Sequence, residues 1–173
     1  MTNVTPIVNF TYKNKVEGCL SNMSSHPVKW NGIDFSMGEA AFHYAKYYII
    51  AQDSSRKKEL LVHADKFLLP CTGPQYKSLG GKSKNGLALT PQELTIWSAS
   101  CDKVQQEICK YKYQTYKDIQ TVLAKTTGVL LIHSCRTADD KMAGEHWCGR
   151  YKDNVILGGN MLGKIWMNIR DNV

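Results

Sequence analysis

Three residues whose side chains are of types that often act in catalysis lie close together in the first third of this 173-residue chain. Glu39, His43 and Lys46 stand at positions i, i+4 and i+7, so on an α-helix they share one face. A carboxylate can stabilise a developing cation, an imidazole can transfer a proton, and an amine of lowered pKa can attack carbon. Glu39 could instead cap the helix and Lys46 could be a solvated surface lysine, so this row needs a second, independent motif.

The last third of the chain offers two further motifs. Residues 145–149 (Glu-His-Trp-Cys-Gly) form a dense polar and aromatic cluster after the apolar run at 129–133. Residues 158–163 (Gly-Gly-Asn-Met-Leu-Gly) form a glycine-rich turn into a helix, whose N-terminus would present free N–H groups to an anion. This turn lacks the spacing of a P-loop and also fits a tight turn with close helix packing.

The segments before and around the first row predict how it is positioned. Residues 7–12 have the β-branched and aromatic content of a strand, and 28–35 predict two short strands joined by a type I′ turn at Asn31-Gly32. Ser36 and Glu39 fit a capping box that starts a helix with an apolar face, running to about residue 49. A second helix is expected from Ser54 or Ser55 through Val62.

The rest of the chain predicts mainly helices and one long loop. Residues 71–89 are rich in Gly and Lys, and we expect either a functional loop that approaches phosphate or a solvated one. Thr90-Pro91-Gln92-Glu93 predicts a helix start. The expected elements after it are a helix to 113 with a break near 101–102, a helix over 116–128, a buried strand at 129–133, an irregular segment at 138–154, and a last helix over 161–170 with Asn160 as its N-cap.

Length and composition indicate one domain, 1–173, of helix-rich α+β class with a small sheet of short strands. The formal net charge of +7 favours anionic partners such as nucleic acid, nucleotides or phosphorylated metabolites. A basic protein with no such partner would have the same total charge.

The six cysteines contain no Cys-x-x-Cys pair and none lies at zinc-finger spacing from paired histidines. We therefore assign no metal ligands and no bound cofactor. The N-terminus has no signal-peptide pattern, and no apolar run reaches the length of a membrane span. We expect free thiols, no membrane association, and a cytoplasmic location, or a nuclear one if the source is eukaryotic.

In combination, these motifs resemble those of the YbiA-like, or NADAR, domain family over nearly the whole chain. The resemblance rests on Leu20-Ser21-Asn22-Met23, Pro27 to Gly32, Phe35, Glu39 and Lys46, then Leu79-Gly80-Gly81 and Trp97, and finally residues 145–149, 158–163 and Arg170. The first half fits the family pattern without a gap. The chain departs from it at Ala40, where the family usually has His, and at His43, where it often has Gln. Glu145 takes the place of an Asp and Cys148 that of a Trp.

The resemblance implies hydrolysis of a bond between ribose C1 and nitrogen. One branch of the family removes ADP-ribose from guanine in nucleic acid, and another cleaves phosphoribosylamino-pyrimidine intermediates of riboflavin synthesis. We favour the first activity because of the basic charge, and a non-catalytic ADP-ribose or nucleic-acid binding module is the alternative of another class. Partners would be ADP-ribosylated nucleic acid or an ADP-ribose-like nucleotide, with a cognate ADP-ribosyltransferase toxin as a functional counterpart.

The resemblance also assigns roles to individual residues. The expected catalytic residues are Glu39, Lys46 and Glu145, and the expected substrate-binding residues are Ser21, Asn22, His43, Trp97, Trp147, Gly158 and Asn160. One carboxylate would stabilise oxocarbenium character at C1 while the other activates water. Lys46 would either neutralise developing charge or attack C1 and form a Schiff base with the opened sugar. Trp97 could stack on a base or belong to the core.

Overall fold

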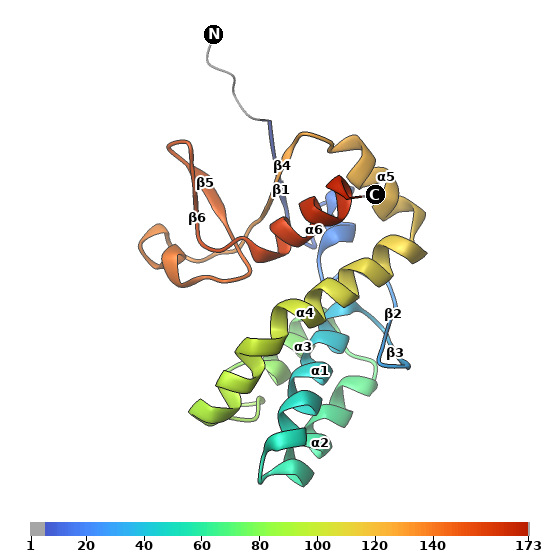
Figure 1. Ribbon diagram of the computed structural model, residues 1–173, viewed down its shortest axis with the longest axis vertical. Helices are drawn as coiled ribbons and strands as arrows, with labels where there is room; N and C mark the ends of the chain where they lie inside the picture. Colours follow the sequence, from blue (N-terminus) through green and yellow to red (C-terminus); the bar gives the residue numbers. More distant parts are fainter. Residues whose placement is uncertain (1–5, 173) are drawn as a thin grey trace. The chain divides into compact units, whose positions relative to one another are not determined.

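The computed structural model describes residues 6–172, and its contacts divide the chain into two compact units. Unit 1 contains residues 6–21 and 113–172, and unit 2 contains residues 22–112. Helices predominate, and the strands form three two-stranded sheets, which confirms the α+β class (Figure 1). None of the helices within residues 6–172 is both long and apolar enough to cross a membrane.

Unit 1 is built around a parallel pair of strands. Its elements are β1 (Ile7–Phe10), η1 (Glu17–Leu20), α5 (Lys117–Lys125), β4 (Leu130–His133), η3 (Asp139–Gly144), β5 (Arg150–Lys152), β6 (Val155–Leu157) and α6 (Met161–Asp171). β1 pairs with β4, with Phe10 opposite His133. α6 packs on β4 and buries Leu162, Ile165 and Trp166, whose indole N–H donates to the Leu20 carbonyl at 2.8 Å.

Unit 2 contains a β-hairpin and the helix that carries Glu39, His43 and Lys46, together with the helices around it. Its elements are β2 (Val28–Trp30), β3 (Ile33–Phe35), α1 (Gly38–Asp53), α2 (Lys57–Ala64), η2 (Asp65–Leu68), α3 (Gly73–Gly80) and α4 (Pro91–Thr115), which runs on into unit 1. α1 packs against α2 and α3. Eleven of its sixteen residues are buried, so α1 is a core helix enclosed on most sides rather than one with a single apolar face.

Several predicted elements are confirmed with small shifts at their ends. The hairpin turns at Asn31 and Gly32, whose φ angles of 49° and 79° are those of a type I′ turn. Thr90 and Glu93 form the expected reciprocal cap, since Thr90 Oγ1 accepts from the Glu93 N–H at 3.2 Å and Glu93 Oε2 accepts from the Thr90 N–H at 2.8 Å. The helix that follows is unbroken at 101–102.

Three predictions are wrong in detail. The segment 71–89 is not a continuous loop, because Thr72 and Gln75 form a capping box that starts α3. The segment 138–154 holds η3 and the first strand of the β5–β6 hairpin, whose turn is formed by Asp153 and Asn154 with φ angles of 50° and 63°. α1 has Met37 at its N-cap and no side-chain cap, so the capping box expected there does not form.

Candidate functional site

The row of Glu39, His43 and Lys46 lies inside unit 2 instead of facing solvent. His43 Nε2 lies 3.2 Å from Glu39 Oε1, and their side chains are only 11% and 13% exposed. Lys46, one turn further on, is 7% exposed. Burial of three polar side chains on one face argues against the alternative of a solvated surface stripe.

Burial changes the acid–base behaviour of Lys46. Removal from water lowers the pKa of its amine from 10.5 to about 8, and the nearby Glu39 carboxylate limits the fall. Its Nζ donates a hydrogen bond to the Gly80 carbonyl and lies 4.6 Å from the centre of the Tyr47 ring. Burial likewise raises the pKa of the Tyr47 hydroxyl to about 12, so this side chain stays neutral beside the amine.

The end of α3 closes over the row. Gly80 lies so close to His43 that a Cβ at this position would overlap the imidazole ring. His43 Nδ1 is buried and has no hydrogen-bond partner among residues 6–172. Leaving an acceptor lone pair unpaired at Nδ1 costs less free energy than leaving an N–H unpaired. We therefore infer that the proton of the neutral imidazole is on Nε2, which donates a hydrogen bond to the Glu39 carboxylate. The Leu79 carbonyl, within hydrogen-bond distance of His63 Nε2 at 2.9 Å, fixes the same turn.

The first turn of α1 is held by Asn22 and not by a cap. The Asn22 carbonyl accepts from the Glu39 N–H at 2.9 Å, and its side-chain amide exchanges two hydrogen bonds with Gln105 of α4, at 2.7 and 2.8 Å. The Ser36 hydroxyl, expected to cap the helix, instead contacts the Tyr76 hydroxyl at 2.9 Å. The carboxylate of Glu39 is therefore not used for capping.

The other predicted residues are distributed between the two units. In unit 2, half-buried Trp97 packs edge-on against Phe42, with ring centres 5.0 Å apart. This contact supports a core role for at least part of the indole. Ser21 is buried in unit 1, where its N–H donates to the Gly18 carbonyl at 3.0 Å.

Glu145 and Trp147 lie in unit 1 on a segment fixed by backbone hydrogen bonds. Glu145 Oε1 accepts from the Thr137 hydroxyl at 2.6 Å, and the Trp147 carbonyl lies 3.3 Å from His133 Nδ1. Glu39 and Glu145 thus belong to different units, and each has its own local partner. Their pairing across one site stays a prediction.

The N–H groups of the glycine-rich turn and of the start of α6 are largely taken up by hydrogen bonds within unit 1. The N–H groups of residues 159–162 donate to the carbonyls of residues 145–148, at 2.6 to 3.4 Å. Gly158 has a φ of 80°, and a Cβ there would lie 2.7 Å from the Cys148 carbonyl. This finding corrects the anion-site interpretation in favour of a tight turn, and substrate contact by Gly158 stays a prediction.

Asn160 links this turn to the sheet. It is the N-cap residue of α6, but its side chain caps nothing. Its Oδ1 accepts from the His133 N–H and its Nδ2 donates to the Leu131 carbonyl, both at 2.9 Å. Because Asn160 is fully buried and both amide atoms bind β4, its evident role is to hold the turn against the strand, and a direct contact with substrate stays a prediction.

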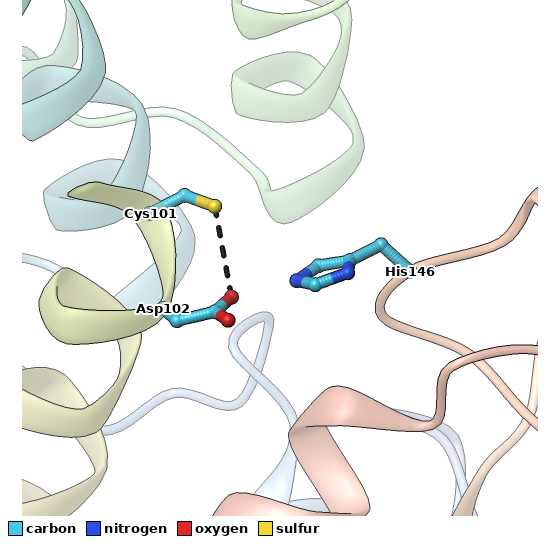
Figure 2. Close-up of side chains that lie close together, drawn as sticks. All are labelled: Cys101, Asp102 and His146. Carbon is cyan, nitrogen blue, oxygen red and sulfur yellow. Dashed lines mark hydrogen bonds between the residues drawn. The ribbon is translucent and has the colours of Figure 1, made fainter. Parts of the chain in front are cut away.

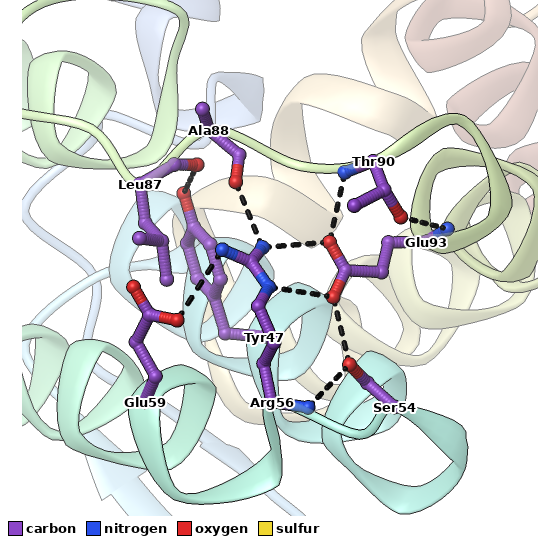
Figure 3. Close-up of polar contacts among 8 residues, drawn as sticks. All are labelled: Tyr47, Ser54, Arg56, Glu59, Leu87, Ala88, Thr90 and Glu93. Carbon is purple, nitrogen blue, oxygen red and sulfur yellow. Dashed lines mark hydrogen bonds and ion pairs between the residues drawn. The ribbon is translucent and has the colours of Figure 1, made fainter.

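A polar cluster that the sequence analysis missed fixes the segment before α4 (Figure 3). The Arg56 guanidinium donates to Glu93 at 2.7 and 3.2 Å and to the Ala88 carbonyl at 2.9 Å. Hydrogen bonding to Arg56 is the main reason that the pKa of Glu93 falls to about 2. The Leu87 carbonyl lies 3.5 Å from the Tyr47 hydroxyl, so this cluster supports the surroundings of Lys46.

The cysteines of α4 are not suited to nucleophilic catalysis. Figure 2 shows Cys101 pointing toward the carboxylate of Asp102, with Sγ and Oδ1 3.6 Å apart. Burial first, and then this carboxylate, raise the pKa of the Cys101 thiol to about 11. Full burial raises that of Cys109 to about 12. The thiolates of these two cysteines are therefore scarce at neutral pH, and the buried Lys46 amine is a better nucleophile than either thiol.

Comparisons with known proteins identify the family and the fold of the chain. A sequence model of the NADAR domain matches residues 9–173. The fold is similar to that of the solved structure of the Escherichia coli protein YbiA, with a TM-score of 0.63 and 18% identity over 96% of this chain and 84% of that chain. At this identity the likeness to YbiA shows the fold alone, and comparison with curated proteins gave no match. The chain belongs to the NADAR domain family, which is linked to N-glycosidase-type activity.

Proposed function

We propose that this protein hydrolyses an N-glycosidic bond and, specifically, removes ADP-ribose from guanine in nucleic acid. The observation that carries the proposal is the buried amine of Lys46, whose pKa is lowered to about 8, on the same helix face as Glu39 and His43. Perturbed amines of this kind are typical of nucleophilic lysines.

The lowered pKa makes Lys46 reactive near neutral pH. About 10% of an amine with a pKa of about 8 is neutral at pH 7, against about 0.03% for an ordinary lysine. In the proposed reaction the Lys46 nitrogen attacks ribose C1 and the bond from C1 to the base nitrogen breaks. The base takes up a proton as it leaves, the sugar opens to a Schiff base, and water releases the ribose and restores the amine.

Glu39 stabilises the positive charge that develops in these steps, and His43 orients the Glu39 carboxylate. The Glu39 carboxylate faces Nε2 of His43 and acts on the Lys46 amine through its field. A carboxylate at this position favours the positive charge that develops on ribose and on the imine nitrogen. His43 holds the carboxylate in place by donating to it, and Gly80 fixes His43 in turn.

The choice of substrate rests on charge and on the family pattern. A net charge of +7 suits a nucleic-acid carrier of the ADP-ribose group better than a small metabolite, which makes no demand for a basic exterior. Within the same proposal, Glu145 is the second acid, and Ser21, Asn22, Trp97 and Trp147 are positioning groups. The proposed setting is cytoplasmic, with an ADP-ribosyltransferase toxin as the source of the modification.

The test is incubation with DNA carrying ADP-ribose on guanine, with release of free ADP-ribose and unmodified DNA as the expected result. Lys46→Arg keeps the charge and removes the nucleophile, so it should abolish turnover, and Glu39→Gln should do the same while sparing binding. Reduction with borohydride during turnover should leave a ribose adduct on Lys46. Binding without turnover would replace the proposal by a binding module, and turnover only of the phosphoribosylamino-pyrimidine would replace the substrate.

A further inference from the structure

A second group of reactive side chains gathers in unit 1, at the loop between β4 and β5. The Sγ atoms of Cys135 and Cys148 and a carboxylate oxygen of Glu145 all lie within 4.8 Å of one another. Cys148 is buried, and the other two are half-buried. Neither Cys135 nor Cys148 forms a disulfide within residues 6–172.

We propose that Cys135, Glu145 and Cys148 bind a zinc-class divalent cation. Thiolate and carboxylate are ligands that Zn²⁺ accepts, at about 2.3 Å for sulfur and about 2.0–2.2 Å for oxygen. A tetrahedron with such bonds has edges of roughly 3.5–3.8 Å, so each pair of ligand atoms needs to close by about 1.3 Å at most. Glu145 and Cys148 are three residues apart, a spacing common between paired zinc ligands, and Cys135 lies two residues after the end of β4.

The backbone that carries two of these ligands, Glu145 and Cys148, is already fixed. The Glu145 carbonyl accepts from the Gly159 N–H at 2.6 Å, and the Cys148 carbonyl accepts from the Asn160 N–H at 2.8 Å. A site held this way does not have to order a loop when the ion arrives, which favours binding.

Thr137 supplies the outer hydrogen bond that metal-binding carboxylates usually have. Its hydroxyl donates to Glu145 Oε1 at 2.6 Å and lies 3.4 Å from the Cys135 sulfur. One carboxylate oxygen of Glu145 is therefore oriented by Thr137, and the other can bind the ion.

The charges of the loop agree with a cation held by two thiolates. Binding releases both thiol protons, and two thiolates with one carboxylate leave a net charge of −1 around a divalent ion. The Arg150 guanidinium donates to the Thr137 carbonyl at 2.9 Å and also pairs with Asp139, so positive charge lies beside this group. Because Cys135 and Glu145 are only half-buried, water can supply the fourth ligand.

The metal site does not rest on the proposed reaction, but it shares Glu145 with that reaction and revises the role of this residue. A Glu145 carboxylate bound to the ion is not free to activate water. Occupancy would therefore leave Glu39 and Lys46 as the catalytic pair.

The experiment uses the 173-residue chain in fully reduced form, stripped of metal and titrated with Co²⁺ and then Zn²⁺. We expect one equivalent of Co²⁺ to give a thiolate-to-cobalt charge-transfer band, which one equivalent of Zn²⁺ should abolish. Cys135→Ser should weaken Zn²⁺ binding by about 100-fold or more, since outer-shell changes alone cost 10–100-fold. Glu145→Gln keeps both thiols and should also weaken binding.

Cys71→Ser is the matched control, because Cys71 is also half-buried but lies in unit 2, and it should bind Zn²⁺ as the wild type does. Circular dichroism checks that each variant is folded, and half-buried Cys135 is the deciding position because serine is better tolerated there than at buried Cys148. Absence of the band in the reduced wild type, or equal binding by wild type and Cys135→Ser, overturns the proposal. So does a Cys135–Cys148 disulfide that forms in air in the presence of excess Zn²⁺.

Discussion

Replacing Lys46 by methionine should change how the free energy of unfolding depends on pH. In the folded protein the Lys46 amine has a pKa of about 8, and in the unfolded chain it returns to 10.5. Between these values the unfolded chain binds more protons than the folded one, so stability rises with pH. The cost of burying the ammonium is fully present below pH 8 and is relieved as the pH approaches 10.5.

The size of the effect follows from the two pKa values. The full difference corresponds to about 3 kcal/mol, of which about 2 kcal/mol is gained between pH 7 and pH 9.5. Because Lys46 is only 7% exposed, solvent screens its charge little and does not reduce this energy much. Lys46→Met has no titrating group at this position, so its curve should lack this rise.

Urea unfolding at several pH values from 7 to 9.5 measures the difference between the two proteins. Lys110→Met is the control, since Lys110 is exposed on α4 and its removal should leave the wild-type slope unchanged. Parallel curves for wild type and Lys46→Met would show that the amine is hydrated in the folded protein. That result would also remove the basis for a reactive lysine at neutral pH.

Three further changes test the supports of the two units. Gly80→Ala should destabilise the protein by about 2 kcal/mol in thermal unfolding and lower turnover, because the added Cβ would overlap the imidazole ring of His43. Gly144→Ala is the control: a Cβ at Gly144 meets open space, so stability should change by less than about 0.5 kcal/mol. Arg56→Leu should lower the free energy of unfolding by about 2 kcal/mol at pH 7, as measured by urea unfolding. This difference from the wild type should shrink as the pH falls from 4.5 toward 2, because Glu93 then becomes protonated in the folded wild type. A difference that stays constant over this range would contradict the role of the ion pair. Asn160→Ala should cost about 3 kcal/mol in thermal unfolding, since it removes two buried hydrogen bonds at a φ of 48°. Asn160→Asp should cost at least as much, because it sets a carboxyl oxygen against the Leu131 carbonyl at a fully buried position.

Local signals in the sequence predicted the elements whose residues act on their own backbone. The Asn31-Gly32 turn and the Thr90 cap need only neighbours in the chain, and both are present in the structure. The sequence also predicted that Glu39, His43 and Lys46 share a face, because helical spacing decides this. It could not predict whether that face is buried, since burial depends on how α2 and α3 pack around α1.

The errors arose where distant residues compete for the same group. Ser36 has the right spacing to cap α1, but the Tyr76 hydroxyl, forty residues away, holds its side chain. The N–H groups before α6 resemble an anion site, but the carbonyls of residues 145–148 reach them first. Such contacts carry no periodic signal. The β5–β6 hairpin is different, because its turn residues Asp153 and Asn154 are of types that favour turns. The sequence of this segment therefore contained a local signal for the hairpin.

The position of Lys46 is hard to explain by stability alone. α1 is enclosed on most sides, and methionine or leucine would fill the same space without removing an ammonium from water. The hydrogen bond to the Gly80 carbonyl offsets only part of the cost of about 3 kcal/mol, and the Glu39 carboxylate leaves the pKa still well below its usual value. A buried amine with a pKa of about 8 is poorly suited to stabilise a core and well suited to the proposed attack on ribose C1. The same enclosure that makes α1 a core helix therefore supplies the low pKa that the proposed chemistry requires.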